Sequence, residues 1–264
     1  MGMNIYMKEQ HIIEVNNDLC IGCGLCKNDC PVNNIYIKNK KSVIKAQDCI
    51  KCGHCVAICP TGAITMTGFD EPAIEFTKQP TLDSNELLIA LKARRTVRKF
   101  KNKEVPSEVI QQIIEAGRFT PSAKNAQDVS YIVLDKNKEQ YEEVAVKTFR
   151  KIKPIVSLWM KDAKEVTIDD NFFFKKAPIV IMVVTKDKIS GSFAASNMAL
   201  MAESYGLGVL YSGFFTEVAN HSKKLRRLLN LKSKRHVVAT LVIGYPDVKY
   251  RRTAQKETAK IIYL

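Results

Sequence analysis

Several common signatures are missing from this sequence. No apolar run approaches the ~18 residues of a membrane-spanning helix, and the longest candidate, residues 178–184, predicts a buried strand. Residues 1–10 contain no apolar signal core, so we expect a cytoplasmic protein with no membrane partner. A P-loop and a strand-linked G-x-G-x-x-G are both absent, which weighs against the two commonest nucleotide-binding folds.

Arginine is absent from the first 80 residues. That stretch holds 8 of the 41 Lys+Arg and 8 of the 27 Asp+Glu, which leaves 33 basic and 19 acidic residues beyond it. The whole net charge of +14 therefore lies in the second part of the chain, and the shift predicts a domain boundary. A basic domain most often has a charged surface, less often an anionic ligand or an acidic partner, and least often a nucleic-acid interface.

Cysteine is confined to two runs of identical spacing, which are Cys20, Cys23, Cys26, Cys30 followed by Pro31, and Cys49, Cys52, Cys55, Cys59 followed by Pro60. The x2, x2, x3 spacing before proline is typical of bacterial ferredoxins. In those proteins three thiolates of one run and the last thiolate of the other hold each four-iron cluster. We therefore assign one [4Fe–4S] cluster to Cys20, Cys23, Cys26 and Cys59, and a second to Cys49, Cys52, Cys55 and Cys30.

The two runs belong to an internal repeat with an offset of 29 residues, in which Gly24 matches Gly53 and Ile35 matches Ile64. Glycine lets the backbone wrap closely, so that amide groups can point at sulfur. A disulfide framework would suit a small secreted domain, and the spacing differs from that of structural zinc sites. His54 stands between two predicted ligands, and we expect it to lie at the surface or behind them.

Residues 68–84 contain two prolines and no clear period, which predicts a linker between a ferredoxin-like domain at 1–67 and a second domain at 85–264. In the second domain the apolar spacing predicts alternating helices and strands. Helices are expected at 85–94 (with Ser84 as the cap), 107–116, 192–205 and 217–229, and strands at 131–134, 179–185, 209–211 and 237–243. The fold class is therefore α+β.

A run of cations with one hydroxyl, residues 94–100, ends the first expected helix. Guanidinium groups suit a phosphate, although a basic helix end is more often a solvated surface. The run resembles the opening motif of the nitroreductase family of FMN proteins. Three further segments resemble that family in order: 120–127 (Pro-Ser-x-x-Asn-x-Gln), 196–215 (a long helix and a turn), and 241–252 (Ile-Gly-Tyr-Pro and a basic tail). Asp128 and Val129 stand where the family often has Pro-Trp.

The resemblance implies an α+β homodimer with FMN at the subunit interface. Residues that would hold the phosphate and the ribityl chain are Arg94, Arg95, Thr96 and Arg98, with Lys249, Arg251 or Arg252 closing on the phosphate. Those that would reach the flavin are Ser122, Asn125 and Gln127, with Ser122 and Asn125 coming from the partner subunit. Backbone at the redox-active edge of the ring would come from Tyr211, Ser212 and Gly213. Without the resemblance, Asn125 and Ser212–Gly213 would be interpreted as simple turns.

These patterns predict an iron–sulfur flavoprotein oxidoreductase without a catalytic acid or base. Electrons would pass from ferredoxin, flavodoxin or NAD(P)H through the clusters to FMN, and then to a nitroaromatic, a quinone or an activated alkene. One alternative is a module that relays electrons between proteins or senses redox state. Another is nucleic-acid binding through the basic clusters at 223–227 and 232–235, which more often are charged surface. Trp159 and the run 172–174 are interpreted equally well as packing or as stacking on substrate.

Overall fold

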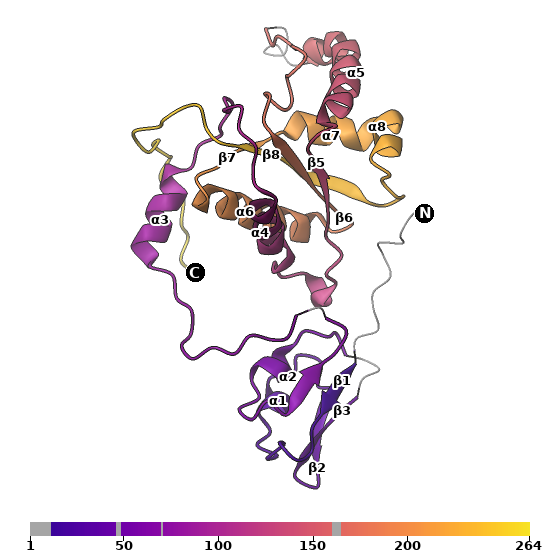
Figure 1. Ribbon diagram of the computed structural model, residues 1–264, viewed down its shortest axis with the longest axis vertical. Helices are drawn as coiled ribbons and strands as arrows, with labels where there is room; N and C mark the ends of the chain where they lie inside the picture. Colours follow the sequence, from indigo (N-terminus) through magenta and orange to yellow (C-terminus); the bar gives the residue numbers. More distant parts are fainter. Residues whose placement is uncertain (1–11, 46–48, 70, 160–164) are drawn as a thin grey trace. The chain divides into compact units, whose positions relative to one another are not determined.

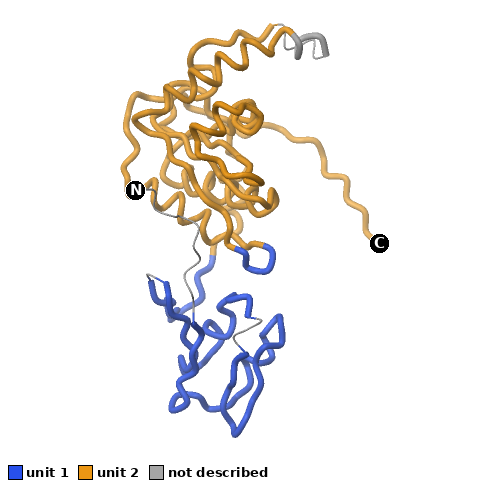
Figure 2. The backbone as a smooth tube through the Cα atoms, turned by 90° about the vertical axis from the view of Figure 1, so that its right-hand side faces the viewer, with its two compact units in different colours: residues 1–81, 123–126 blue, residues 82–122, 127–264 orange. Residues whose placement is uncertain are grey.

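The computed structural model describes residues 12–45, 49–69, 71–159 and 165–264 (Figure 1). The chain divides into two compact units (Figure 2). The first contains Met1–Thr81 and Ala123–Ala126, and the second contains Leu82–Ser122 and Gln127–Leu264. In the part of the chain that is described, no helix has the length and apolar character needed to cross a membrane.

Short elements make up the first unit. Its two antiparallel strand pairs are β1 (Ile13–Val15) with β4 (Ile64–Met66), and β2 (Ile35–Lys38) with β3 (Lys41–Ile44). Its one-turn helices, α1 (Leu25–Asn28) and α2 (His54–Ala57), each follow a glycine with positive φ, at 80° for Gly24 and 77° for Gly53. Side chains with a Cβ rarely adopt this conformation, which explains both glycines of the repeat.

The strands of the first unit follow the same 29-residue repeat. The amide of Asn16 donates to the carbonyl of Ala63 at 2.8 Å, and the amide of Lys45 donates to the carbonyl of Asn34 at 2.8 Å. Adding 29 to Asn16 gives Lys45, and adding 29 to Asn34 gives Ala63. An approximate two-fold operation therefore exchanges the two strand pairs and, with them, the two cysteine runs.

The second unit is built on a four-stranded antiparallel sheet, in the order β5 (Ser130–Leu134), β6 (Ile179–Thr185), β8 (His236–Gly244), β7 (Gly208–Tyr211). All seven residues of β6 are buried. A strand covered on both faces needs no alternation of apolar and polar residues, and for this reason residues 179–185 could be predicted as one apolar run.

Helices cover both faces of this sheet (Figure 1). One core contains Ile179, Ile181 and Val183 packed against α4 (Ser107–Arg118) and α6 (Lys188–Ser204). Alternate residues of β6 point to the opposite face, where the helices are α5 (Lys138–Trp159), α7 (Gly213–His221) and α8 (Lys223–Leu228). The predicted α+β class is confirmed.

Some expected helices have different bounds. The helix expected at 217–229 is two helices, α7 and α8, because Ser222 is extended and its hydroxyl accepts from the amide of Leu225 at 3.3 Å. The first helix, α3 (Ser84–Ala93), is capped by Asp83 rather than Ser84: the Asp83 carboxylate accepts from the amide of Glu86 at 2.8 Å. Both are the N-cap arrangement that satisfies a free amide of the first turn.

Candidate functional site

Four cysteines line each of two pockets in the first unit. The first pocket, of about 290 Å³, is lined by Cys20, Cys23, Cys26 and Cys59. The second, of about 340 Å³, is lined by Cys30, Cys49, Cys52 and Cys55. Each pocket gathers three cysteines of one run and the last cysteine of the other. All eight cysteines lie among the described residues, and none of them is in a disulfide.

Backbone amides point at the sulfur atoms in both pockets. Four of them donate to sulfur at 3.3–3.4 Å, from Asn34 to Cys30, Ser42 to Cys20, Lys51 to Cys49, and Ala63 to Cys59. Gly22 shows how closely the chain wraps, because a Cβ at this residue would lie 2.2 Å from the carbonyl oxygen of Lys40. Amides aimed at sulfur stabilise thiolates, which are the form that binds iron.

The pockets suit a polynuclear cluster better than a single metal ion. Among the described residues, no three His, Cys, Asp or Glu side chains converge closely enough to hold one ion. A zinc ion draws its four ligands to ~2.3 Å from one point, whereas the thiolates of an iron–sulfur cluster stand around a larger body. The buried Nδ2 of Asn34 lines the second pocket without a hydrogen-bond partner, and a sulfide would supply its acceptor. His54 is exposed and also lines this pocket.

In the second unit, two basic segments lie side by side. Residues 96–101 begin beside β7, an edge strand of the sheet, where the amide of Val97 donates to the carbonyl of Val209 at 3.1 Å. The C-terminal segment joins them: Tyr250 Oη donates to the carbonyl of Thr96 at 3.4 Å, and Arg95 Nη2 donates to that of Arg252 at 3.4 Å. The cations at 94–98 and 249–252 are thereby brought together.

Arg94 is the best anchored of these cations. Its Nε lies 2.8 Å from Glu203 Oε2 on α6, and each side chain is 24% exposed. Burial raises the pKa of Glu203, and the guanidinium of Arg94 offsets part of the rise. Burial also raises the pKa of Tyr211, again opposed by Arg94, and the Tyr211 hydroxyl donates to the carbonyl of Ala195 at 2.9 Å. Arg94 therefore links the basic segment to the end of β7.

The turn after β7 presents the N-terminus of α7. The amide of Ser212 donates to the carbonyl of Thr240 at 2.8 Å, but the Ser212 side chain makes no capping bond to α7. The first amides of a helix have no partner within it and carry partial positive charge. A Cβ built at Gly213 would meet nothing within 4 Å, so the backbone here faces open space. The turn can therefore donate to an anionic or carbonyl-bearing group.

The loop at 120–127 forms a separate group. Lys124, Asn125 and Gln127 all have φ near +50°. The amide of Gln127 donates to Ser122 Oγ at 3.0 Å, which holds these two predicted residues together. The segment Ala123–Ala126 belongs to the first compact unit, and within it Asn125 Nδ2 donates to the carbonyls of Ile50 and Lys51 at 3.3 and 2.7 Å. In the single chain, the Asn125 amide is thus occupied by backbone.

Asp128, where the family pattern differs, follows this loop directly and fixes its end to the end of β6 by hydrogen bonds. Its carboxylate accepts from Thr185 Oγ1 at 3.0 Å and from the amide of Lys186 at 3.3 Å. Arg235 is buried and donates to the carbonyls of Asp128 and Val184 at 2.8 and 3.2 Å. The interpretation of 232–235 as a surface basic cluster is therefore wrong for Arg235, whose guanidinium satisfies buried carbonyl groups.

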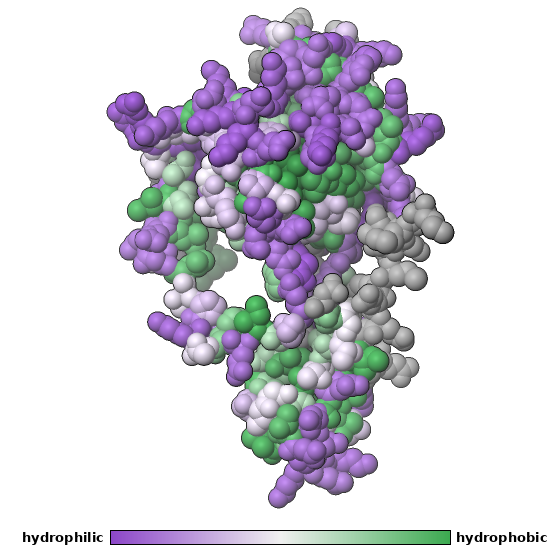
Figure 3. Space-filling view, viewed as in Figure 1, coloured by the Kyte–Doolittle hydropathy of each residue, from purple (hydrophilic) through white to green (hydrophobic). Residues whose placement is uncertain are grey.

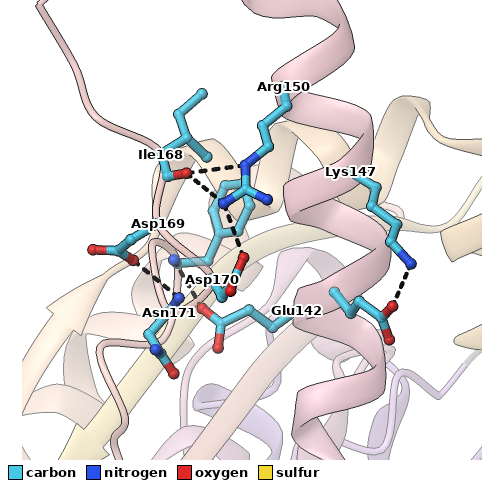
Figure 4. Close-up of polar contacts among 9 residues, drawn as sticks. Glu142, Lys147, Arg150, Ile168, Asp169, Asp170 and Asn171 are labelled. Atoms are coloured by element: carbon cyan, nitrogen blue, oxygen red, sulfur yellow. Dashed lines mark hydrogen bonds and ion pairs between the residues drawn. The ribbon is translucent and has the colours of Figure 1, made fainter.

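A polar network beside α5 includes Glu142 and Arg150 (Figure 4), and it holds the aromatic run 172–174. Glu142, which is buried, accepts from the amides of Phe173 and Phe174 at 2.9 and 2.7 Å. Burial raises the pKa of Glu142 to about 7. Beside it, Arg150 Nη2 donates to the carbonyl of Ile168 at 2.7 Å and to Asp170 at 2.8 Å.

Phe173 and Phe174 lie in the core, which decides between the two interpretations in favour of packing for these two rings. Phe172 is half-buried, and its ring centroid lies 5.7 Å from that of Phe149 and 6.2 Å from that of Phe214. The side chain of Trp159 lies outside the described part of the structure.

Known proteins resemble both units. Residues 91–245 match the nitroreductase family model, and residues 12–60 match a 4Fe-4S dicluster domain. A Methanothermobacter thermautotrophicus protein, provisionally named NADH dehydrogenase/NAD(P)H nitroreductase, is 30% identical over 172 residues, which cover 61% of this chain and 78% of that protein. The iodotyrosine deiodinase of Hydra vulgaris is 27% identical over 195 residues, or 62% of this chain and 66% of that protein. A crystal structure of a nitroreductase with bound FMN from Bacteroides fragilis has 20% identity and a TM-score of 0.56, covering 68% of this chain and 100% of that one.

Proposed function

This chain belongs to the nitroreductase family, as its four motifs predict, and we propose that it is an FMN-dependent oxidoreductase fed by two [4Fe–4S] clusters. The observation that carries the proposal is the presence, in one chain, of two four-cysteine pockets and a basic site beside an uncapped helix. Clusters exchange single electrons and flavins exchange one or two, so two clusters together match one flavin.

We assign the cysteines of the first pocket to one cluster and those of the second pocket to the other. The thiolates would bind iron, and the amides of Asn34, Ser42, Lys51 and Ala63 would stabilise the negative charge on sulfur. The reducing cytoplasm that we expect for this protein keeps such thiols available.

For FMN, the two adjacent basic segments supply the phosphate site. The residues that would hold the phosphate and the ribityl chain are Arg94, Arg95, Thr96 and Arg98, and Lys249, Arg251 or Arg252 would close over them. Among the described residues, Arg98, Lys249 and Arg251 make no ion pair with a carboxylate, so their charge is available to a phosphate.

The flavin ring would lie against the turn at Tyr211, Ser212 and Gly213, where the first amides of α7 can donate to it; the Ser212 amide is held by Thr240. Arg94 reaches this turn while it is held by Glu203, which suits a residue that joins the phosphate end to the ring end. Ser122, Asn125 and Gln127 would approach the flavin of the partner subunit from their own loop.

A second copy of the chain would also cover apolar surface that the single chain leaves exposed. α3 buries none of its residues, and apolar side chains lie on the surface over it (Figure 3). Leu87, Leu88 and Leu91 are 38–49% exposed. Residues 261–264 are apolar and at least 64% exposed. Burial of such surface yields roughly 25 cal/mol per Å², so these segments favour a homodimer.

We expect a one-electron donor such as ferredoxin or flavodoxin, because these carriers are often acidic and the second unit is basic. NAD(P)H is the alternative donor. A nitroaromatic, a quinone or an activated alkene would accept the electrons. A module that relays electrons between proteins or senses redox state is the second function, because clusters and a flavin can also pass electrons to a protein partner.

Protein purified without oxygen should contain about eight irons, about eight acid-labile sulfides and one FMN per chain. Turnover of nitroaromatics or quinones by this preparation would favour the enzyme, whereas a reducible flavin without turnover would favour the relay. Zinc in place of iron, or the absence of flavin, would contradict the proposal. Nucleic-acid binding is dismissed if duplex DNA is not retained at low salt.

A further inference from the structure

The approximate two-fold of the first unit exchanges the two cysteine pockets, so each residue of one pocket has a counterpart in the other. Ser42 pairs with Ile37 between β3 and β2, and Ile13 pairs with Met66 between β1 and β4. Because Ile37 and Met66 are 29 residues apart, as are Ile13 and Ser42, the operation places Ile13 where Ser42 stands. Ser42 lines the first pocket and Ile13 lines the second.

Ser42 offers two donors to two cysteines. It is 5% exposed, and its Oγ lies 3.2 Å from Cys26 Sγ and 3.8 Å from Cys20 Sγ. Its amide donates to Cys20 Sγ at 3.4 Å. A thiolate has no proton to give, so the hydroxyl is the donor once the cysteines bind iron.

Two other differences between the pockets also place a polar or charged group near the first pocket and an apolar residue at the matching place in the second. Thr61 Oγ1 lies 3.7 Å from Cys59 Sγ in the first pocket, and Val32 occupies its place in the second. Lys41 Nζ donates to the carbonyl of Cys20 at 2.7 Å, which holds an ammonium group beside the first pocket. Its counterpart by the 29-residue repeat is Ile12.

The second pocket contains one side-chain amide that the first lacks, because Asn34 corresponds to Ala63. The Nδ2 of Asn34 donates to no cysteine sulfur, and it would face a sulfide of the second cluster instead. His54 lines the second pocket from an exposed position where the first pocket has Leu25. Among the described residues, side-chain hydroxyls therefore reach sulfur only in the first pocket.

We propose that the Ser42 hydroxyl raises the reduction potential of the cluster held by Cys20, Cys23, Cys26 and Cys59, so that the two clusters are unequal. This rests on the proposed two-cluster function. Reduction adds one electron, and hence one negative charge, to a cluster without breaking a bond. Hydrogen bonds to its thiolates stabilise the more negative state and raise the potential. The first pocket is thus the electron sink of the pair.

The test is an anaerobic potentiometric titration with dithionite as the one-electron reductant, followed by EPR. The native full chain should show two separate midpoint potentials. Ser42→Ala should lower the higher midpoint and leave the lower one in place, and Ser42→Thr, which keeps the hydroxyl, should restore it. Ile13→Thr should raise the lower midpoint, whereas its matched control Ile13→Val, which has the same shape without a hydroxyl, should not.

A single midpoint in the native chain would overturn the proposal, as would a Ser42→Ala protein with unmoved midpoints or with both moved equally. If Ser42→Ala loses iron, the comparison of Ile13→Thr with Ile13→Val decides the question. Iron and sulfide are measured first on each sample. Native protein with zinc or with well under eight irons contradicts the two-cluster function itself, whereas full cluster content with unmoved midpoints contradicts only the role of Ser42.

Discussion

In the first unit the eight predicted cluster ligands lie within residues 20–59, whereas in the second unit the contact between Arg95 and Arg252 joins residues 157 positions apart. The cysteine pockets are made by tight loops whose spacing is local. The basic site is made by strands and helices that bring distant segments together. A local motif can be recognised from spacing alone, but a site assembled from distant segments can be recognised only through a family resemblance or a structure.

The units also differ in what balances charge. The first unit directs amides and hydroxyls at sulfur. The second surrounds its site with cations, of which, among the described residues, only Arg94 is paired with a carboxylate. Removal of a ligand in the first unit should therefore delete a cofactor. Removal of one cation in the second unit should only weaken the binding of its cofactor, because several other contacts remain.

Replacement of Cys30 by Ser should remove the cluster of the second pocket, because Cys30 lies there with Cys49, Cys52 and Cys55. Iron should fall from about eight to about four per chain. The reciprocal variant, Cys59→Ser, should remove the cluster of the first pocket. EPR of the reduced proteins would then show two different single-cluster spectra. If the Cys30 variant loses the same cluster as Cys20→Ser, the crossed assignment is wrong.

Replacement of Arg98 or Arg94 by Ala should weaken FMN binding, since a hydrogen bond to a charged group contributes about 1.5–3 kcal/mol, or about 10- to 150-fold in affinity. Fluorescence titration of the deflavinated protein with FMN measures this affinity. Arg227→Ala on α8 removes the same charge elsewhere and is the control. Riboflavin, which lacks the phosphate, should bind poorly to native protein and should lose little in either variant. Equal FMN affinity in all proteins would refute the phosphate role.

Glu142 should make the stability of the second unit depend on pH. Burial raises its pKa in the folded protein to about 7 from an ordinary value of 4.5, so the folded state binds more protons between these values. The contribution of Glu142 to the free energy of unfolding should therefore be largest below pH 4.5 and should fall as the pH rises through 7. Allowing for solvent screening, the loss is about 1–2 kcal/mol.

The matched variant is Glu142→Gln, which keeps an oxygen for the amides of Phe173 and Phe174 but cannot ionise. Denaturant unfolding at several pH values should show its advantage over native protein growing from pH 5 to pH 8. The cluster absorbance of the first unit should not follow this difference. Parallel pH profiles for the two proteins would exclude the titration of Glu142.

The smallest effect concerns Ser222, the cap between α7 and α8. Ser222→Ala should reduce the free energy of unfolding by about 1 kcal/mol, because it removes the acceptor for the amide of Leu225. Ser192→Ala is the control, since that hydroxyl bonds only to a carbonyl of its own helix. Equal stability of the two variants would mean that the break at Ser222 does not depend on its side chain.

The sequence predicts some of these features and not others. The bounds of β6 were predictable because seven apolar residues in a row suit a strand buried on both faces. The break at Ser222 was not, because the apolar residues on either side continue one helical period. The sequence gives no sign that Arg235 is buried, because its partners Asp128 and Val184 are 107 and 51 residues away.

In the candidate site too, local spacing was predictable and contacts between distant segments were not. The cysteine spacing predicted which cysteines would share a pocket. The ion pair of Arg94 with Glu203 had no local signal, because α6 is distant in sequence. The 29-residue repeat pairs Ile13 with Ser42 directly, but only the structure shows that Ser42 lies against Cys20 and Cys26.

The central claim is that electrons reach FMN through the clusters. Stopped-flow mixing of the full chain with reduced ferredoxin, with cluster and flavin absorbance followed separately, tests it most directly. Cluster bleaching should precede flavin bleaching. The bimolecular rate constant should fall as the salt concentration rises, because the Debye screening length shortens to ~8 Å near an ionic strength of 0.15 M. A cluster-deficient Cys20→Ser, Cys49→Ser protein should lose flavin reduction by ferredoxin. If NADPH reduces its flavin at the native rate, and ferredoxin reduces neither protein, the account is contradicted.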